Sequence, residues 1–409
     1  MDNLQERLGH YLRGPASRSS LYLFAGAACL GTYAIWRTIS SNALESSPKS
    51  IPSPAKTVLP HLSRKETRRL PYPPDALPGV RDVESPYGSI RVYEWGREDG
   101  ERVLFVHGIS TPSLALGGVA HMLVERGYRV MLFDLFNRGY SSGPSPSTTN
   151  YDSALYTSQI LTVLTSSHLP WASEPFILIG YSLGGAIAAD FTSYFPHLIR
   201  GLVLIATGGL IRTNHISWKS RLLYSTSGLL PERFLERLVA RRLWTGPETA
   251  RSIEPEADTD PELKNEEDRK GGLRSSAVYS SSHRVLLPGN PDSTVGEVVD
   301  WQLQHHQGFV PAFISSIRHA PIHNQHHRWR VIGERMRKRE GFLKHVDFVL
   351  GARDPIIIAD ELQEDAKEVL GEEFVRVDVV EGSGHEVPIE RPDVVVKAVQ
   401  RISADWETQ

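Results

Sequence analysis

The residue best suited to nucleophilic chemistry is Ser182, which lies in the run Gly180-Tyr-Ser-Leu-Gly184. The apolar run FILIG precedes it, and the run AIAADFTSYF, typical of a helix, follows it. A strand, a sharp turn and a helix present a serine hydroxyl on a strained backbone, and small glycines on both sides avoid collisions across the turn. The N-terminus of the helix also favours developing negative charge. The pattern predicts that Ser182 is an activated nucleophile rather than a serine chosen for its size in a tight turn.

A nucleophilic serine needs a general base, and the base needs a group that orients it. His385 follows the last predicted strand in GSGHEVP, and Asp354 ends the strand before it in GARDPI. The competing interpretations are a histidine on a surface loop and an aspartate that forms a turn. Parallel sheets carry their chemistry at the carboxyl ends of their strands, where both residues fall. The chain order Ser182, Asp354, His385 is also an established order of nucleophile, acid and base, so we predict these roles.

The tetrahedral intermediate of acyl transfer needs hydrogen-bond donors for its oxyanion. The residue after the nucleophile, Leu183, is expected to supply one backbone N–H. The strand VLFV ends in His-Gly-Ile-Ser at 107–110, where the loop bends over the nucleophile. Ile109, or alternatively Ser110, is expected to supply the second N–H, and each donor is worth roughly 3 kcal/mol. His107 is expected to brace this loop rather than act as a base.

Short apolar runs and helical segments alternate from residue 89 onward, which predicts an α/β fold with a mostly parallel central sheet and helices on both faces. The expected strands are 89–96, 103–108, 128–134, 176–182, 202–208, 346–354 and 374–382. The expected helices between them are 113–126, 152–168, 183–195 and 359–370.

The motifs HGIS, DLFNRGYS, GYSLGG, GARDPI and GSGHEVP follow one another in the order found in the alpha/beta-hydrolase superfamily. The resemblance covers roughly residues 85–210 and 340–405. The layout is similar to that of membrane-anchored monoacylglycerol-lipase-type hydrolases and of uncharacterised fungal members with long caps. Asn137 departs from the pattern, because glycine often stands at this turn. The resemblance implies the alpha/beta-hydrolase fold, a serine-hydrolase mechanism and a helical cap inserted before the strand that carries Asp354.

The cap implied by the resemblance spans residues 211–340, between the hydrolase core parts 80–210 and 341–409. Segments 216–244 and 297–318 have apolar residues at the spacing of amphipathic helices. The polar stretch 250–295 is expected to be an exposed, mobile loop. The run His-Asn-Gln-His-His at 323–327 places histidines on one helix face. We interpret it as a solvated or hydrogen-bonded face rather than a metal site.

The uncharged run SSLYLFAGAACLGTYAIW lies between Arg18 and Arg37 and is just long enough to cross a bilayer core of roughly 30 Å. We predict a leader at 1–20, a single-pass anchor at 21–38 and a flexible linker, rich in Ser and Pro, at 39–79. A cleaved signal peptide, a mitochondrial presequence and a buried soluble helix are the alternatives. The single cysteine permits no intrachain disulfide, which favours a catalytic domain on the cytosolic side of a membrane.

The composition is that of an ordinary globular protein, with 40% hydrophobic and 23% charged residues among 409. The formal net charge of −3 gives no support to a nucleic-acid partner.

The predicted function is hydrolysis of a carboxylic ester, with a small lipid-like or secondary-metabolite acyl substrate, through an acyl-enzyme. No cofactor and no metal are expected. A thioesterase or a carbon–carbon bond hydrolase would use the same three residues. A catalytically silent scaffold that has kept the fold is the alternative outside enzymes. Fold alone does not decide among these functions.

Overall fold

The computed structural model describes residues 29–34, 50–212, 224–225, 231–244 and 283–407. The chain divides into two units, Met1–Pro48 and Lys49–Gln409. In the first unit the structure describes one short helical stretch, 29–34. Most of the anchor predicted at 21–38, and all of the leader, lie outside the described residues. Within the described ranges, no helix is sufficiently long and apolar to cross a membrane.

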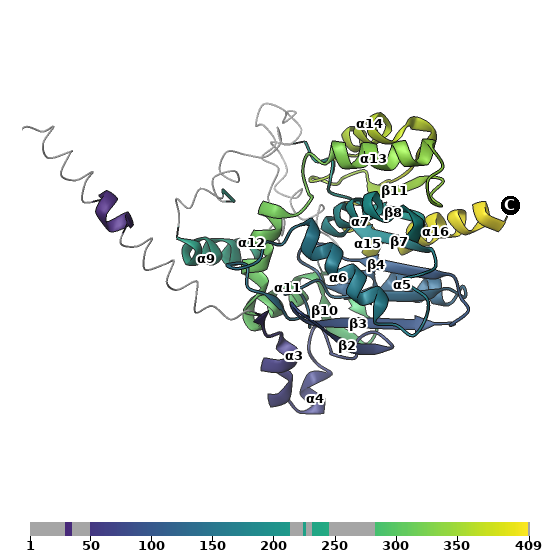
Figure 1. Ribbon diagram of the computed structural model, residues 1–409. Coiled ribbons are helices and arrows are strands. Elements are labelled where there is room, and N and C mark those ends of the chain that lie inside the picture. Colours follow the sequence, from purple (N-terminus) through teal and green to yellow (C-terminus); the bar gives the residue numbers. More distant parts are fainter. Residues whose placement is uncertain (1–28, 35–49, 213–223, 226–230, 245–282, 408–409) are drawn as a thin grey trace, which may run out of the picture. The chain divides into compact units, whose positions relative to one another are not determined.

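The second unit is built on an eight-stranded sheet (Figure 1). Its strands, in spatial order, are β12 (Val375–Val380), β11 (Val346–Gly351), β8 (Ile199–Ile205), β7 (Phe176–Tyr181), β4 (Arg102–Val106), β5 (Arg129–Phe133), β3 (Gly88–Gly96) and β2 (Val80–Ser85). The pairs β2–β3 and β3–β5 are antiparallel, and the other neighbours are parallel. The predicted α/β class with a mostly parallel sheet is confirmed.

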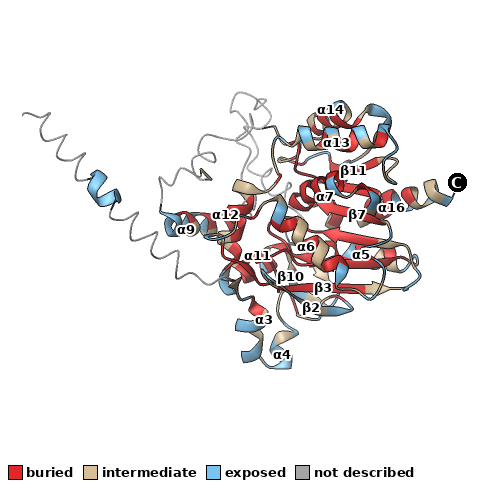
Figure 2. Cartoon of the chain, viewed as in Figure 1, coloured by how far each residue is buried: buried red, intermediate tan, exposed pale blue. Residues whose placement is uncertain are grey.

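The central strands are buried on both faces, as near-continuous apolar sequences require. Every residue of β5, β7 and β11 is buried, and Figure 2 shows the buried residues concentrated in the sheet and in the helix faces against it. The edge strand β2 instead alternates between exposed and half-buried positions. Its alternating polar sequence VRDVES was not among the predicted strands.

Helices cover the sheet on both faces. On one side α5 packs against α16, and the short α15 contacts both of them and β11, and on the other side α6, α7, α13 and α14 pack in succession. Their bounds are α5 (Gly117–Val124), α6 (Ser153–Thr165), α7 (Leu183–Tyr194), α13 (His326–Arg337), α14 (Ala359–Leu370), α15 (Val387–Glu390) and α16 (Pro392–Glu407). Short 3₁₀ turns are η2 (Ser113–Leu116), η3 (Pro196–Leu198) and η8 (Glu372–Phe374). The helix predicted at 359–370 coincides with α14.

The insertion between β8 and β11 supplies a cap. It contains α9 (Glu232–Leu243), a hairpin of β9 (Val285–Leu287) and β10 (Asn290–Thr294), and helices α11 (Val295–His305) and α12 (Phe309–His319). Thr294 begins α11, since its hydroxyl accepts the backbone N–H of Glu297 at 3.3 Å. The hairpin differs from the loop expected at 250–295, of which residues 250–282 lie outside the described residues.

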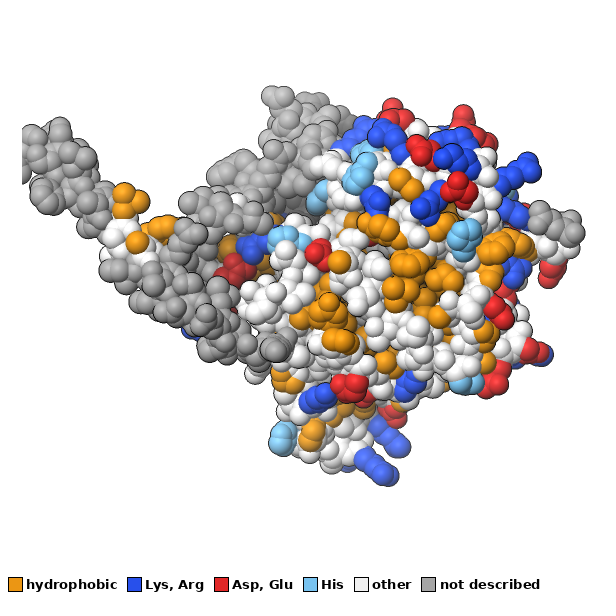
Figure 3. Space-filling view, in the orientation of Figure 1, with side chains coloured by type: hydrophobic (Ala, Val, Ile, Leu, Met, Phe, Trp, Pro, Cys, Tyr) orange, Lys and Arg blue, Asp and Glu red, His pale blue; other side chains and the backbone are white. Residues whose placement is uncertain are grey.

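The last part of the predicted cap belongs to the core layer. Helix α13 lies between α7 and α14 and buries Trp329, Ile332 and Met336 against them. Its basic residues face outward, where Arg330 lies 2.8 Å from Glu368 of α14. Figure 3 shows acidic and basic side chains interspersed over this region. The basic run of α13 is therefore a solvated face with partners of the opposite charge.

Residues 50–79 differ from the flexible linker expected at 39–79. They form β1 (Ser50–Ile51), which pairs with β6 (Gly143–Pro144), and the short helices α3 (Pro54–Thr57), η1 (Leu59–His61) and α4 (Arg64–Thr67). Tyr72 and Leu77 are fully buried in the core, and the Tyr72 hydroxyl donates to the Asp134 carboxylate at 3.2 Å. The segment is rich in Ser and Pro, so its composition did not indicate that two buried side chains, Tyr72 and Leu77, attach it to the core.

Candidate active site

Ser182 lies at the turn between β7 and α7, with a φ of 54° and a ψ of −117°. This conformation is strained for a residue with a side chain, and such strain is typical of functional sites. Two hydrogen bonds hold the turn, because Ser182 N donates to Ile205 O at 2.9 Å and Gly208 N donates to Ser182 O at 3.1 Å. A Cβ at Gly184 would lie 2.1 Å from the carbonyl oxygen of Val106, so only glycine fits there.

The structure brings the three predicted residues together from three separate strand ends. Ser182 Oγ lies 3.0 Å from His385 Nε2, and His385 Nδ1 lies 2.8 Å from Asp354 Oδ2. A carboxylate oxygen can only accept here, so Nδ1 carries a proton, and in the neutral ring Nε2 accepts from the serine hydroxyl. All three residues are buried, with exposed fractions of 8%, 2% and 8% for Ser182, His385 and Asp354.

Asp354 is held by its own loop. Its Oδ1 accepts the backbone N–H groups of Ile356 at 2.8 Å and of Ile357 at 3.0 Å. Oδ2 therefore stays directed at the imidazole of His385, whose other side is flanked by the Tyr181 ring at a centroid distance of 5.5 Å. The carboxylate thus fixes both the tautomer and the orientation of the ring.

The loop after β4 passes beside the nucleophile, since a Cβ at Gly108 would lie 3.5 Å from the Ser182 Cβ. His107 braces this loop: its Nδ1–H donates to Gly108 O at 2.7 Å, and Leu135 N donates to its Nε2 at 2.8 Å. In a trans peptide the N–H points opposite to the C=O, so the Ile109 N–H is directed away from His107. Leu183 is the first residue of α7, and such an N–H has no acceptor within its helix.

Two buried histidines support this region in their neutral form. Burial lowers the pKa of His107 to about 3 and that of His306 to about 4. His306, just after α11, donates from Nε2 to Ser141 O at 3.0 Å and accepts Gly308 N at Nδ1. Protonation of either ring would place a second N–H against a backbone donor.

This arrangement predicts destabilisation by mild acid. An unfolded histidine titrates near pH 6.5, so below this pH the unfolded chain binds protons that folded His107 and His306 refuse. Each histidine should therefore reduce the free energy of unfolding by about 1.4 kcal/mol per pH unit as the pH falls from 6.5 toward the folded pKa. Urea unfolding at pH 7, 6 and 5 measures the slope.

The contribution of one residue is isolated by His306→Gln, which should lower the proton uptake on unfolding at pH 5 by about one. The control variant is Gln304→Ala, at an exposed and non-titrating position of α11, which should keep the wild-type slope. If His306→Gln showed the same dependence of the unfolding free energy on pH as the control variant, His306 would have to take up its proton in the folded state.

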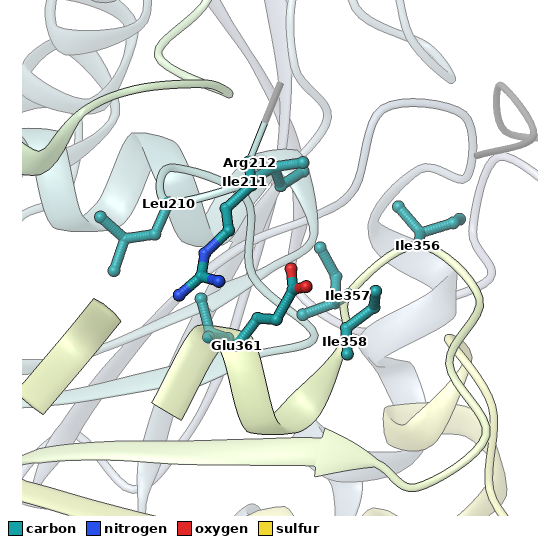
Figure 4. A pocket seen from close by; sticks show the side chains of 8 residues that line it. Leu210, Ile211, Arg212, Ile356, Ile357, Ile358 and Glu361 are labelled. Atoms are coloured by element: carbon teal, nitrogen blue, oxygen red, sulfur yellow. The ribbon is translucent and has the colours of Figure 1, made fainter. Parts of the chain in front are cut away.

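A small hollow that is open to solvent and lined mainly by apolar side chains lies next to the Asp354 loop. Figure 4 shows that its walls come from the segment after β8, the loop after β11 and the first turn of α14, with the side chains of Leu210, Ile211, Arg212, Ile356, Ile357, Ile358 and Glu361. Leu362 completes the lining. Arg212, at the rim, is held by Asp365 at 2.8 Å. The hollow begins two residues beyond Gly208, whose N–H bonds the Ser182 carbonyl.

The fold brings two further side chains to the loop after β4, of which the sequence indicated a structural role for Arg138, in the turn after β5, but gave no sign of Gln302. Arg138 is fully buried and donates from Nε to Ile109 O at 2.6 Å, and Gln302 of α11 donates from Nε2 to Ser110 O at 2.9 Å. Gln302 lies 192 residues from its partner in the chain, and no local pattern marks such a contact. The histidine run at 323–327 was interpreted from sequence as a solvated or hydrogen-bonded face. In the structure, Nε2 of its His326 lies 3.7 Å from the Asp365 carboxylate.

Comparison with known proteins identifies relatives for most of the folded unit. Residues 103–398 match the profile of the alpha/beta hydrolase family. An uncharacterized protein of Mycobacterium tuberculosis is 30% identical over 146 residues, which make up 34% of this chain and 40% of that protein. The chain therefore spans about two fifths of the length of this relative.

Among solved structures, an esterase from Rhodococcus sp. ECU1013 has a TM-score of 0.50 at 19% identity, over 80% of this chain and 98% of the esterase. A membrane phospholipase A, described as a bacterial virulence factor, has a TM-score of 0.53 at 16% identity, over 95% of this chain and all of the phospholipase. At these identities the likeness concerns the fold.

Proposed function

Since the chain belongs to the alpha/beta hydrolase family, we propose that it is a serine hydrolase that cleaves carboxylic esters through an acyl-enzyme. The observation that carries this proposal is the hydrogen-bonded series Asp354, His385 and Ser182, with separations of 2.8 and 3.0 Å. A serine on a strained turn, a neutral imidazole that can accept its proton and a buried carboxylate behind it are the parts that serine-based acyl transfer requires.

In the proposed reaction the Ser182 oxygen attacks the carbonyl carbon of the ester while His385 Nε2 takes its proton. The negative charge moves to the carbonyl oxygen, which the N–H groups of Leu183 and Ile109 stabilise. His385 then protonates the leaving alcohol, and the carbonyl re-forms as the acyl-enzyme. Water, deprotonated by the same ring, attacks the acyl carbon, and His385 returns this proton to the Ser182 oxygen as the acyl–oxygen bond breaks, which releases the acid and restores the serine. Asp354 stabilises the imidazolium in both half-reactions.

The apolar hollow supports a lipophilic acyl substrate. Six of its eight lining residues are isoleucine or leucine, and the other two are Arg212 and Glu361. Each methylene that it buries contributes about 0.8 kcal/mol to binding. The phospholipase A and the esterase with the same fold are described by their names as acting on lipid or ester substrates. Alkyl esters of medium chain length are therefore the first substrates to assay.

A charge introduced into the hollow should remove this preference. Ile356 is half-buried at its wall, and Ile356→Asp should raise KM for p-nitrophenyl octanoate by about tenfold, the loss of roughly two buried methylenes. KM for p-nitrophenyl acetate, which is too short to fill the hollow, should stay within about twofold. Steady-state kinetics on the two esters measures the ratio.

Val379→Asp is the matched control, since Val379 is 43% exposed on β12 and does not line the hollow. It should leave the ratio of the two KM values unchanged. An unchanged ratio in Ile356→Asp as well would exclude the hollow as an acyl site.

A panel of substrates tests the reaction class. Carboxylic esters should be hydrolysed faster than the matched acyl thioesters and than diketones that require carbon–carbon cleavage. Preferential turnover of a thioester or a diketone would leave the proposed roles of Ser182, His385 and Asp354 unchanged but would contradict the proposed ester specificity. A folded protein inactive on all three classes would favour the silent scaffold.

Membrane attachment through residues 21–38, with the hydrolase unit in the cytosol, stays a prediction. Carbonate extraction of membranes from cells that express the full chain tests it. The protein should stay in the pellet, and a variant that lacks residues 1–48 should move to the supernatant. Release of the full chain by carbonate would argue against an anchor.

A further inference from the structure

Three consecutive carbonyl groups of the loop after β4 are each held by a buried side chain. Gly108 O accepts from His107 Nδ1 at 2.7 Å, Ile109 O from Arg138 Nε at 2.6 Å, and Ser110 O from Gln302 Nε2 at 2.9 Å. The side chains of His107 and Arg138 belong to the core. Gln302 belongs to α11 of the cap, so one of the three constraints on this loop comes from the cap.

The amide of Gln302 is fixed at both ends. Its Nε2 donates to Ser110 O, and its Oε1 accepts the N–H of Gly139 at 2.8 Å. The residue is fully buried. Rotation of the amide by 180° would set its oxygen against the Ser110 carbonyl and its NH₂ against the Gly139 N–H, so only one orientation satisfies both loops. Gln302 therefore connects the loop after β4 with the turn after β5.

Neighbouring cap residues hold the same part of the core. Arg138 Nη2 donates to Ser316 Oγ of α12 at 3.2 Å, and its guanidinium lies over the Phe309 ring at 5.4 Å. His306 bonds Ser141 O at 3.0 Å. Withdrawal of α11 and α12 would break these hydrogen bonds, each of which contributes about 0.5–1.5 kcal/mol. This half of the cap is consequently a fixed part of the site.

We propose that Gln302 is a positioning residue for the oxyanion hole, so that the cap helps to hold the catalytic backbone in its reactive conformation. The inference rests on the proposed serine-hydrolase function. An oxyanion hole stabilises the transition state only while its N–H groups stay aimed at the developing charge. A peptide that turns over replaces the N–H with a carbonyl, which repels the oxyanion. The peptide that carries the Ile109 N–H is held directly by His107, through Gly108 O, and the next peptide by Arg138, through Ile109 O. Gln302 holds the following carbonyl, Ser110 O, so it opposes movement of the loop on the far side of Ile109 and helps to keep the Ile109 N–H in its direction.

The test is Gln302→Glu, assayed at pH 8 in the full-length protein. The glutamate keeps the acceptor for Gly139 N–H and has nearly the same volume, but its second oxygen faces the Ser110 carbonyl and repels it. We expect kcat to fall by about 10- to 100-fold, somewhat less than the loss of an oxyanion donor itself, with KM within about twofold. Affinity for an alkyl trifluoromethyl ketone, which forms a tetrahedral adduct with the serine, should fall in parallel with kcat/KM.

Two further variants keep the result interpretable. Gln302→Ala removes both contacts and should show the same parallel loss of kcat and inhibitor affinity. Gln304→Glu places the same charge at an exposed position of α11 and should behave as wild type. Thermal unfolding of each variant separates a loss of structure from a loss of positioning, since general destabilisation would not shift kcat and inhibitor affinity together at a temperature where all variants are folded.

The outcomes separate this inference from the proposed function. An active wild-type protein, with Gln302→Glu and Gln302→Ala folded and unchanged in kcat, would overturn the positioning role alone. A fall in kcat without any loss of affinity for the trifluoromethyl ketone would also overturn it. A folded wild-type protein without hydrolase activity would overturn the proposed function and this inference together.

Discussion

Ser182→Ala should abolish ester hydrolysis, with kcat lower by about a millionfold than in the wild type. The variant removes the atom that would form the acyl-enzyme, while His385 and Asp354 keep their 2.8 Å contact. The residual rate should come only from the groups around the oxyanion, roughly 10³- to 10⁴-fold above the reaction in water. Initial rates with a medium-chain p-nitrophenyl ester, over several orders of enzyme concentration, measure the loss.

The matched control is Ser193→Ala, because Ser193 is also buried on α7 but its hydroxyl bonds only the Asp190 carbonyl of its own helix, at 2.7 Å. Its kcat should stay within a few-fold of the wild type. Substantial hydrolysis by folded, highly purified Ser182→Ala would show that another group performs the attack.

Asp354→Asn should lower kcat by roughly 10⁴-fold, the effect expected when an imidazole is held in the wrong tautomer. The amide Oδ1 can still accept the N–H groups of Ile356 and Ile357, so the loop should keep its conformation. Its NH₂, however, would face His385 Nδ1 and require that nitrogen to accept. The proton would then move to Nε2, which could no longer receive the proton of Ser182.

This tautomer argument predicts that raising the pH will not restore the activity of Asp354→Asn. The imidazole of the variant would carry its single proton on Nε2 instead of Nδ1, and a higher pH does not change this preference. Steady-state rates from pH 6 to 9 measure this. Asp360→Asn, at an exposed position in the first turn of α14, is the control and should be fully active. If kcat of Asp354→Asn fell by less than about tenfold, either another carboxylate would orient His385 or His385 would act without an orienting carboxylate.

Sequence patterns predicted the buried strands because a strand covered on both faces must be apolar throughout. Their ends were less accurate. The run from 202 to 208 suggested a strand through Gly208, but β8 ends at Ile205. The backbone leaves the sheet there because Gly208 N turns to bond Ser182 O, and Gly209 adopts a φ of 107°. The residues that follow β8 are small or apolar, so their sequence resembles the continuation of a strand.

The three reacting residues could be predicted because each lies in a motif whose local geometry is encoded by nearby residues. The 2.8 and 3.0 Å separations among them are products of the fold. Gln302 illustrates the limit of local patterns, because its importance follows from contacts with Ser110 and Gly139, which lie 192 and 163 residues away in the chain. A buried glutamine in an otherwise amphipathic helix is the only local sign of such a contact.

The most direct test of an activated serine is labelling of the full-length protein with a fluorophosphonate, followed by mass spectrometry of its peptides. The reagent transfers its phosphonyl group to a serine only where a base removes the hydroxyl proton and an oxyanion hole receives the charge. We predict one adduct per chain, on Ser182, and none in Ser182→Ala. An adduct on another residue, or no adduct in folded wild-type protein that the reagent has saturated, would contradict the account.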